Sequence, residues 1–214
     1  MNLDDIKFGN PPKEQDDKVK ADRAGILRAC IDKGIVKDIL ENHSFPANSS
    51  DETKMELEYL VEVTKEADDD DFKFCKLLEH HHYDFLAIAG KKLGLDVTAE
   101  QIKNWCFDID PVLFYLKDKF NRPRPYQLAR ELGLELYAIV TTDANSASYP
   151  SGHSLDFLVT LYHFGKIKPE AAEEIDKFYH KIKRVRELSG VHFPSDRKIS
   201  EYLFKQLVKH NLIK

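Results

Sequence analysis

The sequence of 214 residues contains no apolar stretch close to the roughly 18 residues that a membrane helix requires. Residues 1–20 are polar and acidic and lack the basic and apolar regions of a secretory signal, so we expect a cytoplasmic protein. Basic residues are fewer than acidic ones, so the net charge is -5 and the pI is about 6.0. Nucleic-acid binders usually have a basic face, so neither nucleic acid nor a membrane is an expected partner. Any anionic substrate would have to meet a local cluster of cations.

Cysteine is scarce, with only Cys30, Cys75 and Cys106 in the whole chain. Their odd number, their wide separation and their place in helical apolar patterns favour buried reduced thiols over disulfides. The alternation of apolar and polar residues that is typical of strands is missing, and no internal repeat occurs. The sequence therefore predicts an all-α protein.

Helical periodicity is what the sequence does contain. Residues 1–20 lack it and include Pro11 and Pro12, so they are predicted to form an N-terminal arm. Residues 21–214 are predicted to form a single domain, a compact helical bundle. In the first half, helices are expected over 21–40 with Gly34 as a weak point, from a Ser49–Glu52 capping box up to the acidic run 67–71, and over 72–93. A further helix is expected after a Thr98–Gln101 capping box, and another with Asp110 as N-cap and Pro111 as its first residue. A short helix is expected after the segment 121–127, followed by helices over 153–164, over 170–188 and from 195 onward.

Three short segments in the second half hold residues that suit phosphate chemistry. They are Lys117-x6-Arg124-Pro125, Pro150-Ser151-Gly152-His153 and Arg186-x5-His192-x3-Asp196. Phosphoryl transfer develops negative charge on three oxygens, and its catalysis consists mostly of positioning and electrostatic stabilisation. Lys117, Arg124 and Arg186 are therefore candidate phosphate-binding cations, although each alone would ordinarily be a solvated surface charge. Arginine can bind two phosphate oxygens at once, which makes Arg124 and Arg186 the expected clamps.

The middle segment precedes a predicted apolar helix. The free N–H groups at a helix start bind anions, and a glycine lets the backbone approach a ligand closely. Ser151 and Gly152 are therefore predicted to donate hydrogen bonds to phosphate oxygens. A plain serine N-cap followed by a glycine turn would be the ordinary interpretation of this segment alone.

The last segment pairs a histidine with a carboxylate. Pro194 prevents an uninterrupted helix, so His192 is expected to precede a helix that begins near Ser195, and Asp196 can then reach back to the imidazole. A carboxylate bonded to one ring nitrogen leaves the lone pair of the other free to attack and stabilises the positive phosphohistidine that follows. For an isolated pair, a structural hydrogen bond is the more common role.

Together the three segments resemble the motifs of the type 2 phosphatidic acid phosphatase superfamily over residues 117–196. That superfamily includes soluble class A bacterial acid phosphatases, membrane lipid phosphatases and vanadium haloperoxidases, and the segment SYPSGHS closely resembles the acid phosphatase version. The resemblance implies a fold of the same helical type and attack of His192 on phosphorus. It also implies that His153 protonates the leaving alkoxide and later activates water. No metal or other cofactor is required, although phosphate or vanadate can occupy such a site. Val185 departs from the pattern, because the family usually has a small hydroxyl residue there.

The expected function is hydrolysis of small soluble phosphate monoesters, with such an ester as the partner and a homodimer left open. A vanadium-dependent haloperoxidase is one alternative, because vanadate mimics the phosphoryl transition state, but such enzymes are usually much longer. A phosphate-binding protein that has lost turnover is the second alternative, and the intact set of His153, His192 and Asp196 counts against it.

The run His80, His81, His82 suggests a metal site, and Glu79 with His82 resembles the Glu-x-x-His unit of di-iron bundles. That architecture needs a second such unit, which the sequence does not contain. Consecutive helical residues also point about 100° apart, so three adjacent histidines do not converge on one ion. A role at the surface or at a pocket edge is therefore favoured.

Overall fold

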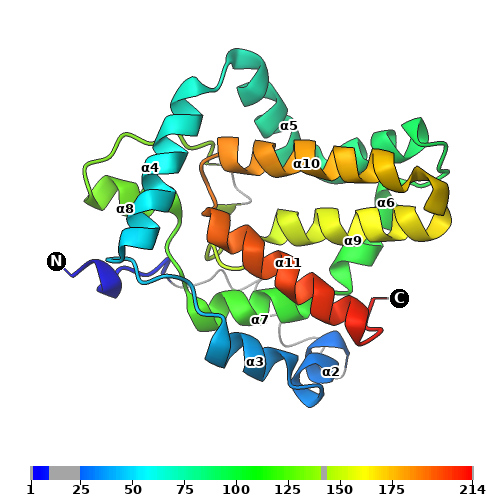
Figure 1. Cartoon of the computed structure of the whole chain (residues 1–214), viewed down its shortest axis with the longest axis horizontal. Helices are drawn as coiled ribbons and strands as arrows, with labels where there is room; N and C mark the ends of the chain where they lie inside the picture. The colour runs from blue at the N-terminus through cyan, green and yellow to red at the C-terminus, as the bar shows by residue number, and fades with distance from the viewer. Residues whose placement is uncertain (1, 10–24, 141–143, 214) are drawn as a thin grey trace.

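The computed structural model describes residues 2–9, 25–140 and 144–213, and in these residues it is all helical, as predicted, with no strand (Figure 1). The elements are η1 (Leu3–Asp5), α2 (Ile26–Asp32), α3 (Ile35–Asn42), α4 (Asp51–Glu66), α5 (Asp69–Lys92), α6 (Ala99–Phe107), α7 (Asp110–Phe120), α8 (Pro125–Glu131), α9 (Gly152–Ile167), η3 (Pro169–Ala171), α10 (Ala172–Leu188) and α11 (Pro194–Lys209). None of the helices in this part of the chain has the length and apolar character needed to cross a bilayer.

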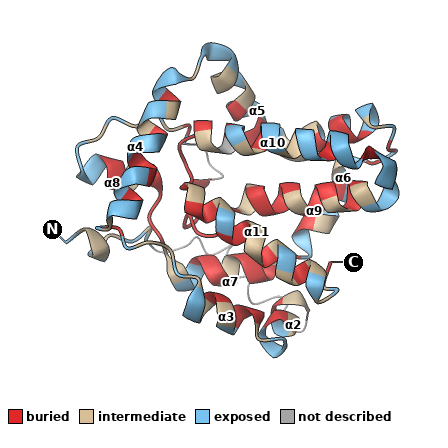
Figure 2. Cartoon of the chain, in the orientation of Figure 1, coloured by how far each residue is buried: buried red, intermediate tan, exposed pale blue. Residues whose placement is uncertain are grey.

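Helix α9 lies in the middle of the bundle, packed against α6, α10 and α11 (Figures 1 and 2). Phe157, Leu161 and Phe164 join a core that α5, α6 and α10 complete, whereas Leu155 and Val159 join a second core with α2, α3, α7 and α11. A helix that is apolar on nearly every side has to be buried. Burial on both sides fixes the N-terminus of α9, where the predicted phosphate-binding segment stands.

Two predicted helix boundaries in the first third of the chain are wrong. The helix expected over 21–40 is two helices, α2 and α3, because Gly34 adopts a left-handed φ of 76° between them. The helix α4 is capped by Ser50, whose hydroxyl accepts from the N–H of Thr53, and not by the predicted Ser49–Glu52 box. Ser49 instead donates to the Asp4 carboxylate from its hydroxyl, at 2.7 Å. The described residues 2–9 of the N-terminal arm are thus fastened to the start of α4.

Two of the three middle helices, α5 and α6, begin at an acidic or a hydroxyl cap. Asp68 caps α5 with Asp71 in a capping box, so the acidic run starts this helix as well as ending the previous one, and α5 begins before the predicted residue 72. The Thr98–Gln101 box at α6 is confirmed. Helix α7 starts at Asp110 itself, one residue earlier than expected, with Ile109 as its N-cap.

Helix α5 is kinked at His81, which has non-helical angles of φ -136° and ψ 31° inside the helix. The kink changes the direction in which the side chains after it point. His82, the next residue, contacts His153 in the first turn of α9. The three cysteines are buried thiols within the described residues, as expected.

Candidate active site

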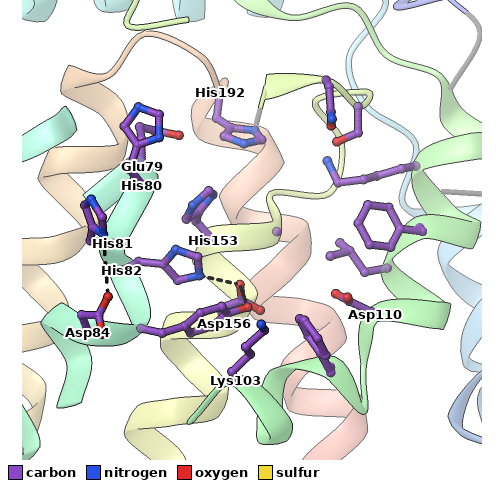
Figure 3. Close-up of a pocket in the computed structure, with 18 of the residues that line it drawn as sticks. Glu79, His80, His81, His82, Asp84, Lys103, Asp110, His153, Asp156 and His192 are labelled. Atoms are coloured by element: carbon purple, nitrogen blue, oxygen red, sulfur yellow. Dashed lines mark hydrogen bonds and ion pairs between the residues drawn. The ribbon is translucent and has the colours of Figure 1, made fainter. Parts of the chain in front are cut away.

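One cavity of about 410 Å³ lies between α5, α6, α7 and α9, and the segments that precede α8, α9 and α11 close it (Figure 3). It is the place where the three predicted segments meet. Its lining residues are Glu79, His80, His81, His82, Tyr83, Asp84, Lys103, Phe107, Asp110, Leu113, Phe114, Lys117, Arg124, Asn145, Ser146, Gly152, His153, Asp156 and His192.

His192 and Asp196 form the predicted pair. Pro194 is the first residue of α11, so His192 lies in the turn before the helix and Asp196 in its first turn. Asp196 Oδ2 lies 3.2 Å from His192 Nδ1 and accepts the N–H of Phe193 at 2.8 Å. Both side chains are buried, with 5% and 0% exposure. The imidazole is therefore held by its Nδ1 side, and its Nε2 side faces the cavity.

Arg122 holds the other oxygen of this carboxylate, and the sequence did not single it out. Its Nη1 donates to Asp196 Oδ1 and to Ser195 Oγ, each at 2.7 Å, and its Nη2 lies 3.3 Å from Glu56 Oε2. The guanidinium is fully buried and stacks on the Phe193 ring at 3.8 Å. Glu56 also accepts the N–H of Ser195 at 2.7 Å. A buried charge is stable only when it is paired and hydrogen-bonded, and this network meets that need for Asp196.

Arg124 fixes the tautomer of His192. Its Nη1 lies 3.1 Å from His192 Nε2, and its Nε donates to the carbonyl of Ser146 at 2.8 Å. Because a guanidinium has only donors, Nε2 must accept, and the proton of the neutral ring is on Nδ1, where it is donated to Asp196. The Nε2 lone pair is thus directed at the Arg124 guanidinium, and both groups lie at the wall of the cavity.

Lys117 and Arg124 are the predicted cations that the structure brings together. Lys117 is 2% exposed and donates to the carbonyl of Ala147, and Arg124 is 3% exposed. Two cations this deeply buried at one cavity are suited to an anion. The third predicted cation, Arg186, lies in α10, and its side chain is outside the described residues.

The start of α9 places Gly152 and His153, but not Ser151, in the cavity lining. Gly152 and His153 line the cavity, and a Cβ built on Gly152 would meet Leu113 Cδ2 at 3.3 Å. Ser151 does not line it: its N–H donates to the carbonyl of Asp196 at 3.1 Å, and its hydroxyl caps α9. In this structure Ser151 holds the helix start, and its contact with phosphate stays a prediction.

Burial and charge set the protonation of the His192–Asp196 pair. Burial, followed by the positive charges of Arg124 and Lys117, lowers the pKa of His192 well below its ordinary 6.5. Burial alone would raise the pKa of Asp196, but the Arg122 charge and the His192 hydrogen bond hold that pKa at about 2. Near neutral pH the pair is an ionised carboxylate beside a neutral imidazole, which is the state a nucleophile needs.

A second histidine–aspartate pair lines the same cavity. His82 Nε2 lies 3.3 Å from Asp156 Oδ2, and the Tyr83 hydroxyl donates to the same oxygen at 3.4 Å. The His82 ring meets the His153 ring edge-on, with centroids 4.4 Å apart. His80, His81 and His82 all reach the cavity because α5 is kinked at His81, which the regular-helix argument did not allow for. Among the described residues, no three His, Cys, Asp or Glu side chains come together as metal ligands would.

Comparison with known proteins adds no relative. No protein-family model matches the chain, and no curated protein matches it. The resemblance to phosphatases therefore rests on the three short segments alone.

Proposed function

We propose that the protein is a metal-independent phosphomonoesterase of the acid phosphatase type, acting on small phosphate esters through a phosphohistidine on His192. One observation carries the proposal: a neutral imidazole, held by a buried carboxylate, lines the same cavity as two buried cations, one of which contacts its Nε2 atom. His153 lines the same cavity (Figure 3). Nucleophile, charge stabilisation and a proton-transfer group are the parts that phosphoryl transfer needs.

In the first step, Nε2 of His192 forms a bond to phosphorus while the ester P–O bond breaks. Lys117 and Arg124 bind the non-bridging oxygens, and an entering phosphoryl group takes over the Arg124 N–H that otherwise contacts Nε2. His153 gives its proton to the leaving alkoxide, which departs as the alcohol. Asp196 offsets the positive charge that the phosphorylated ring acquires.

In the second step, His153 has lost its proton and acts as a base. It takes a proton from a water whose oxygen attacks phosphorus, and the N–P bond breaks. Inorganic phosphate leaves, His192 returns to its neutral form, and His153 is again protonated for the next substrate.

Hydrolysis of p-nitrophenyl phosphate across pH, with excess EDTA, tests this proposal. We expect turnover that EDTA does not abolish and that His192→Ala reduces by about a thousandfold or more. Mass spectrometry of the enzyme quenched at alkaline pH should find one phosphoryl group, on His192. Turnover that EDTA abolishes, or that His192→Ala leaves intact, contradicts the mechanism.

His163→Asn is the matched control for His153→Asn, because both histidines are on α9. His163 is buried against Trp105, with ring centroids 4.3 Å apart, and does not line the cavity. We expect His153→Asn to cost about a hundredfold or more on an alkyl phosphate and less on p-nitrophenyl phosphate, whose leaving group needs little protonation. His163→Asn should leave the ratio of the two rates unchanged. Equal losses on both substrates in His153→Asn would contradict the assignment of His153 as proton donor.

A further inference from the structure

The His82–Asp156 pair is unexplained by the mechanism above. Asp156 is 8% exposed, and its Oδ2 carries the contacts to His82 and Tyr83. Its Oδ1 is buried and has no hydrogen-bond partner among the described residues, and His82 Nε2 also makes no hydrogen bond there, so the 3.3 Å contact is an ion-pair contact of a protonated His82. A carboxylate buried with half of its acceptors unused is costly unless a positive or strongly polar group compensates it. His82, at 3.3 Å, is a group that can do so, and Lys103 is a further cation in the lining of the same cavity.

The pair is placed to act on His153. Asp156 follows His153 by three residues on α9, so the two side chains share one face of the helix. His82 comes from α5, after the kink at His81, and its ring stands between Asp156 and the edge of the His153 ring. In Figure 3 the rings of His192, His153 and His82 follow one another along the cavity, with Asp156 beyond His82.

This arrangement restricts the His153 ring. The His82 ring lies 4.4 Å from it at an interplanar angle of 64°, and Phe157 lies on another side with centroids 6.4 Å apart. His82 itself cannot swing away without breaking its contact to the buried Asp156 carboxylate. A proton donor within a few tenths of an ångström of its productive position is faster than one that samples several rotamers.

We propose that His82 and Asp156 are positioning residues for proton transfer by His153: the Asp156 carboxylate fixes the His82 imidazole, and His82 holds His153 toward the leaving-group oxygen. The proposal rests on the proposed function, since it assigns a role within the same site. It predicts an effect on leaving-group protonation and none on phosphate binding. The reason is that Lys117 and Arg124 hydrogen-bond to the loop before α9 and to the segment before α11, on the other side of the cavity from the pair.

The test compares Asp156→Asn and His82→Gln with the wild type on p-nitrophenyl phosphate and on glycerol phosphate. We expect kcat for glycerol phosphate to fall by about tenfold or more beyond any fall for p-nitrophenyl phosphate. KM and inhibition by inorganic phosphate should stay within about twofold of wild type. Asp176→Asn is the control, because Asp176 forms a similar contact to His180, at 3.6 Å, in an exposed part of α10. It should change neither rate.

A double-mutant cycle separates positioning from packing. In a His153→Asn background, Asp156→Asn should add no further leaving-group selectivity, since it acts through a ring that is gone. Equal losses on both substrates, or a full additional loss in the His153→Asn background, would overturn the positioning role while the phosphatase proposal stands. A wild-type protein without turnover on any ester would overturn both. Because His82→Gln and Asp156→Asn break the same contact from two elements, one variant that fails to fold leaves the other to decide.

Discussion

Two histidine–aspartate pairs face one cavity, and they are built differently. His192 and Asp196 are neighbours across one helix start, are almost fully buried, and have a fixed partner on each side. His82 and Asp156 come from α5 and α9, their side chains are 13% and 11% exposed, and neither His82 Nε2 nor Asp156 Oδ1 makes a hydrogen bond among the described residues. The first pair is fixed by hydrogen bonds on both sides. The second has an ion-pair contact, one hydrogen bond from the Tyr83 hydroxyl and ring contacts of His82, so it is held less tightly.

The largest expected effect is on the anchor of the first pair. Arg122→Met removes the guanidinium and leaves the Asp196 and Glu56 carboxylates buried without it. Loss of one partner of a buried ion pair costs about 3 kcal/mol or more. Urea unfolding should show that loss, together with loss of turnover. Arg28→Met is the control, since the Arg28 and Asp32 side chains of that ion pair are 70% and 68% exposed. An equal loss of unfolding free energy in Arg28→Met would contradict the special role of the buried Arg122 contacts.

Acid should weaken the first pair in two stages. Below pH 6.5 the unfolded chain protonates His192, whereas the folded protein resists because that pKa is lowered, so the free energy of unfolding falls as pH falls. Between pH 3.8 and about 2 the unfolded chain protonates Asp196 while the folded protein keeps the carboxylate ionised, at a further cost of about 2 kcal/mol.

Thermal unfolding followed from pH 8 to pH 2 measures this acid sensitivity. The Asp196→Asn variant should lack the lower stage, and exposed Asp176→Asn should reproduce the wild-type curve because solvent screens that residue. A free energy of unfolding that rises with acid over this range would contradict the assigned protonation states.

The smallest effect concerns Ser151, whose N–H donates to the carbonyl of Asp196 and whose hydroxyl caps α9, the helix that carries Asp156. Ser151→Ala removes the hydroxyl that caps α9 but keeps the N–H that donates to the Asp196 carbonyl. We expect a loss of about 1 kcal/mol in the free energy of unfolding and a KM within about twofold of wild type. A large rise in KM would instead support the predicted contact between Ser151 and phosphate.

Local patterns allowed part of this site to be predicted. Pro194 and the spacing from His192 to Asp196 placed a carboxylate beside an imidazole at a helix start, and Lys117 and Arg124 do reach the same cavity. These features depend on short stretches of chain, whose geometry is set by proline and helix periodicity. The all-helical fold followed from the same periodicity.

The supporting residues depend on tertiary contacts that no local pattern encodes. Arg122 and Arg124 are two residues apart in one Pro-rich segment, and only the folded chain shows that the first holds Asp196 and the second faces the cavity. Glu56 lies on the buried face of α4, beside Leu57, and its sequence neighbours give no sign of the arginine that it meets. His82 reaches the His153 ring after a kink in α5 where the sequence has neither proline nor glycine.

The wrong cap of α4 has the same origin. Ser49 and Ser50 are adjacent, and either hydroxyl could cap a helix in an isolated peptide. In the folded chain the Asp4 carboxylate accepts from the Ser49 hydroxyl, and Ser50 is the residue that caps the N–H of Thr53. A contact between residues 45 positions apart therefore decides which serine caps the helix.

The Glu56–Arg122–Asp196 network has a consequence for the order of events during synthesis. Glu56 and Arg122 leave the ribosome long before Asp196, which lies in the first turn of α11. Until then the two earlier residues lack the carboxylate that completes the network, and the His192 imidazole lacks its Asp196 partner. If the proposed phosphatase activity is real, turnover therefore requires a chain made and assembled through α11, and a nascent chain halted before this helix should show none.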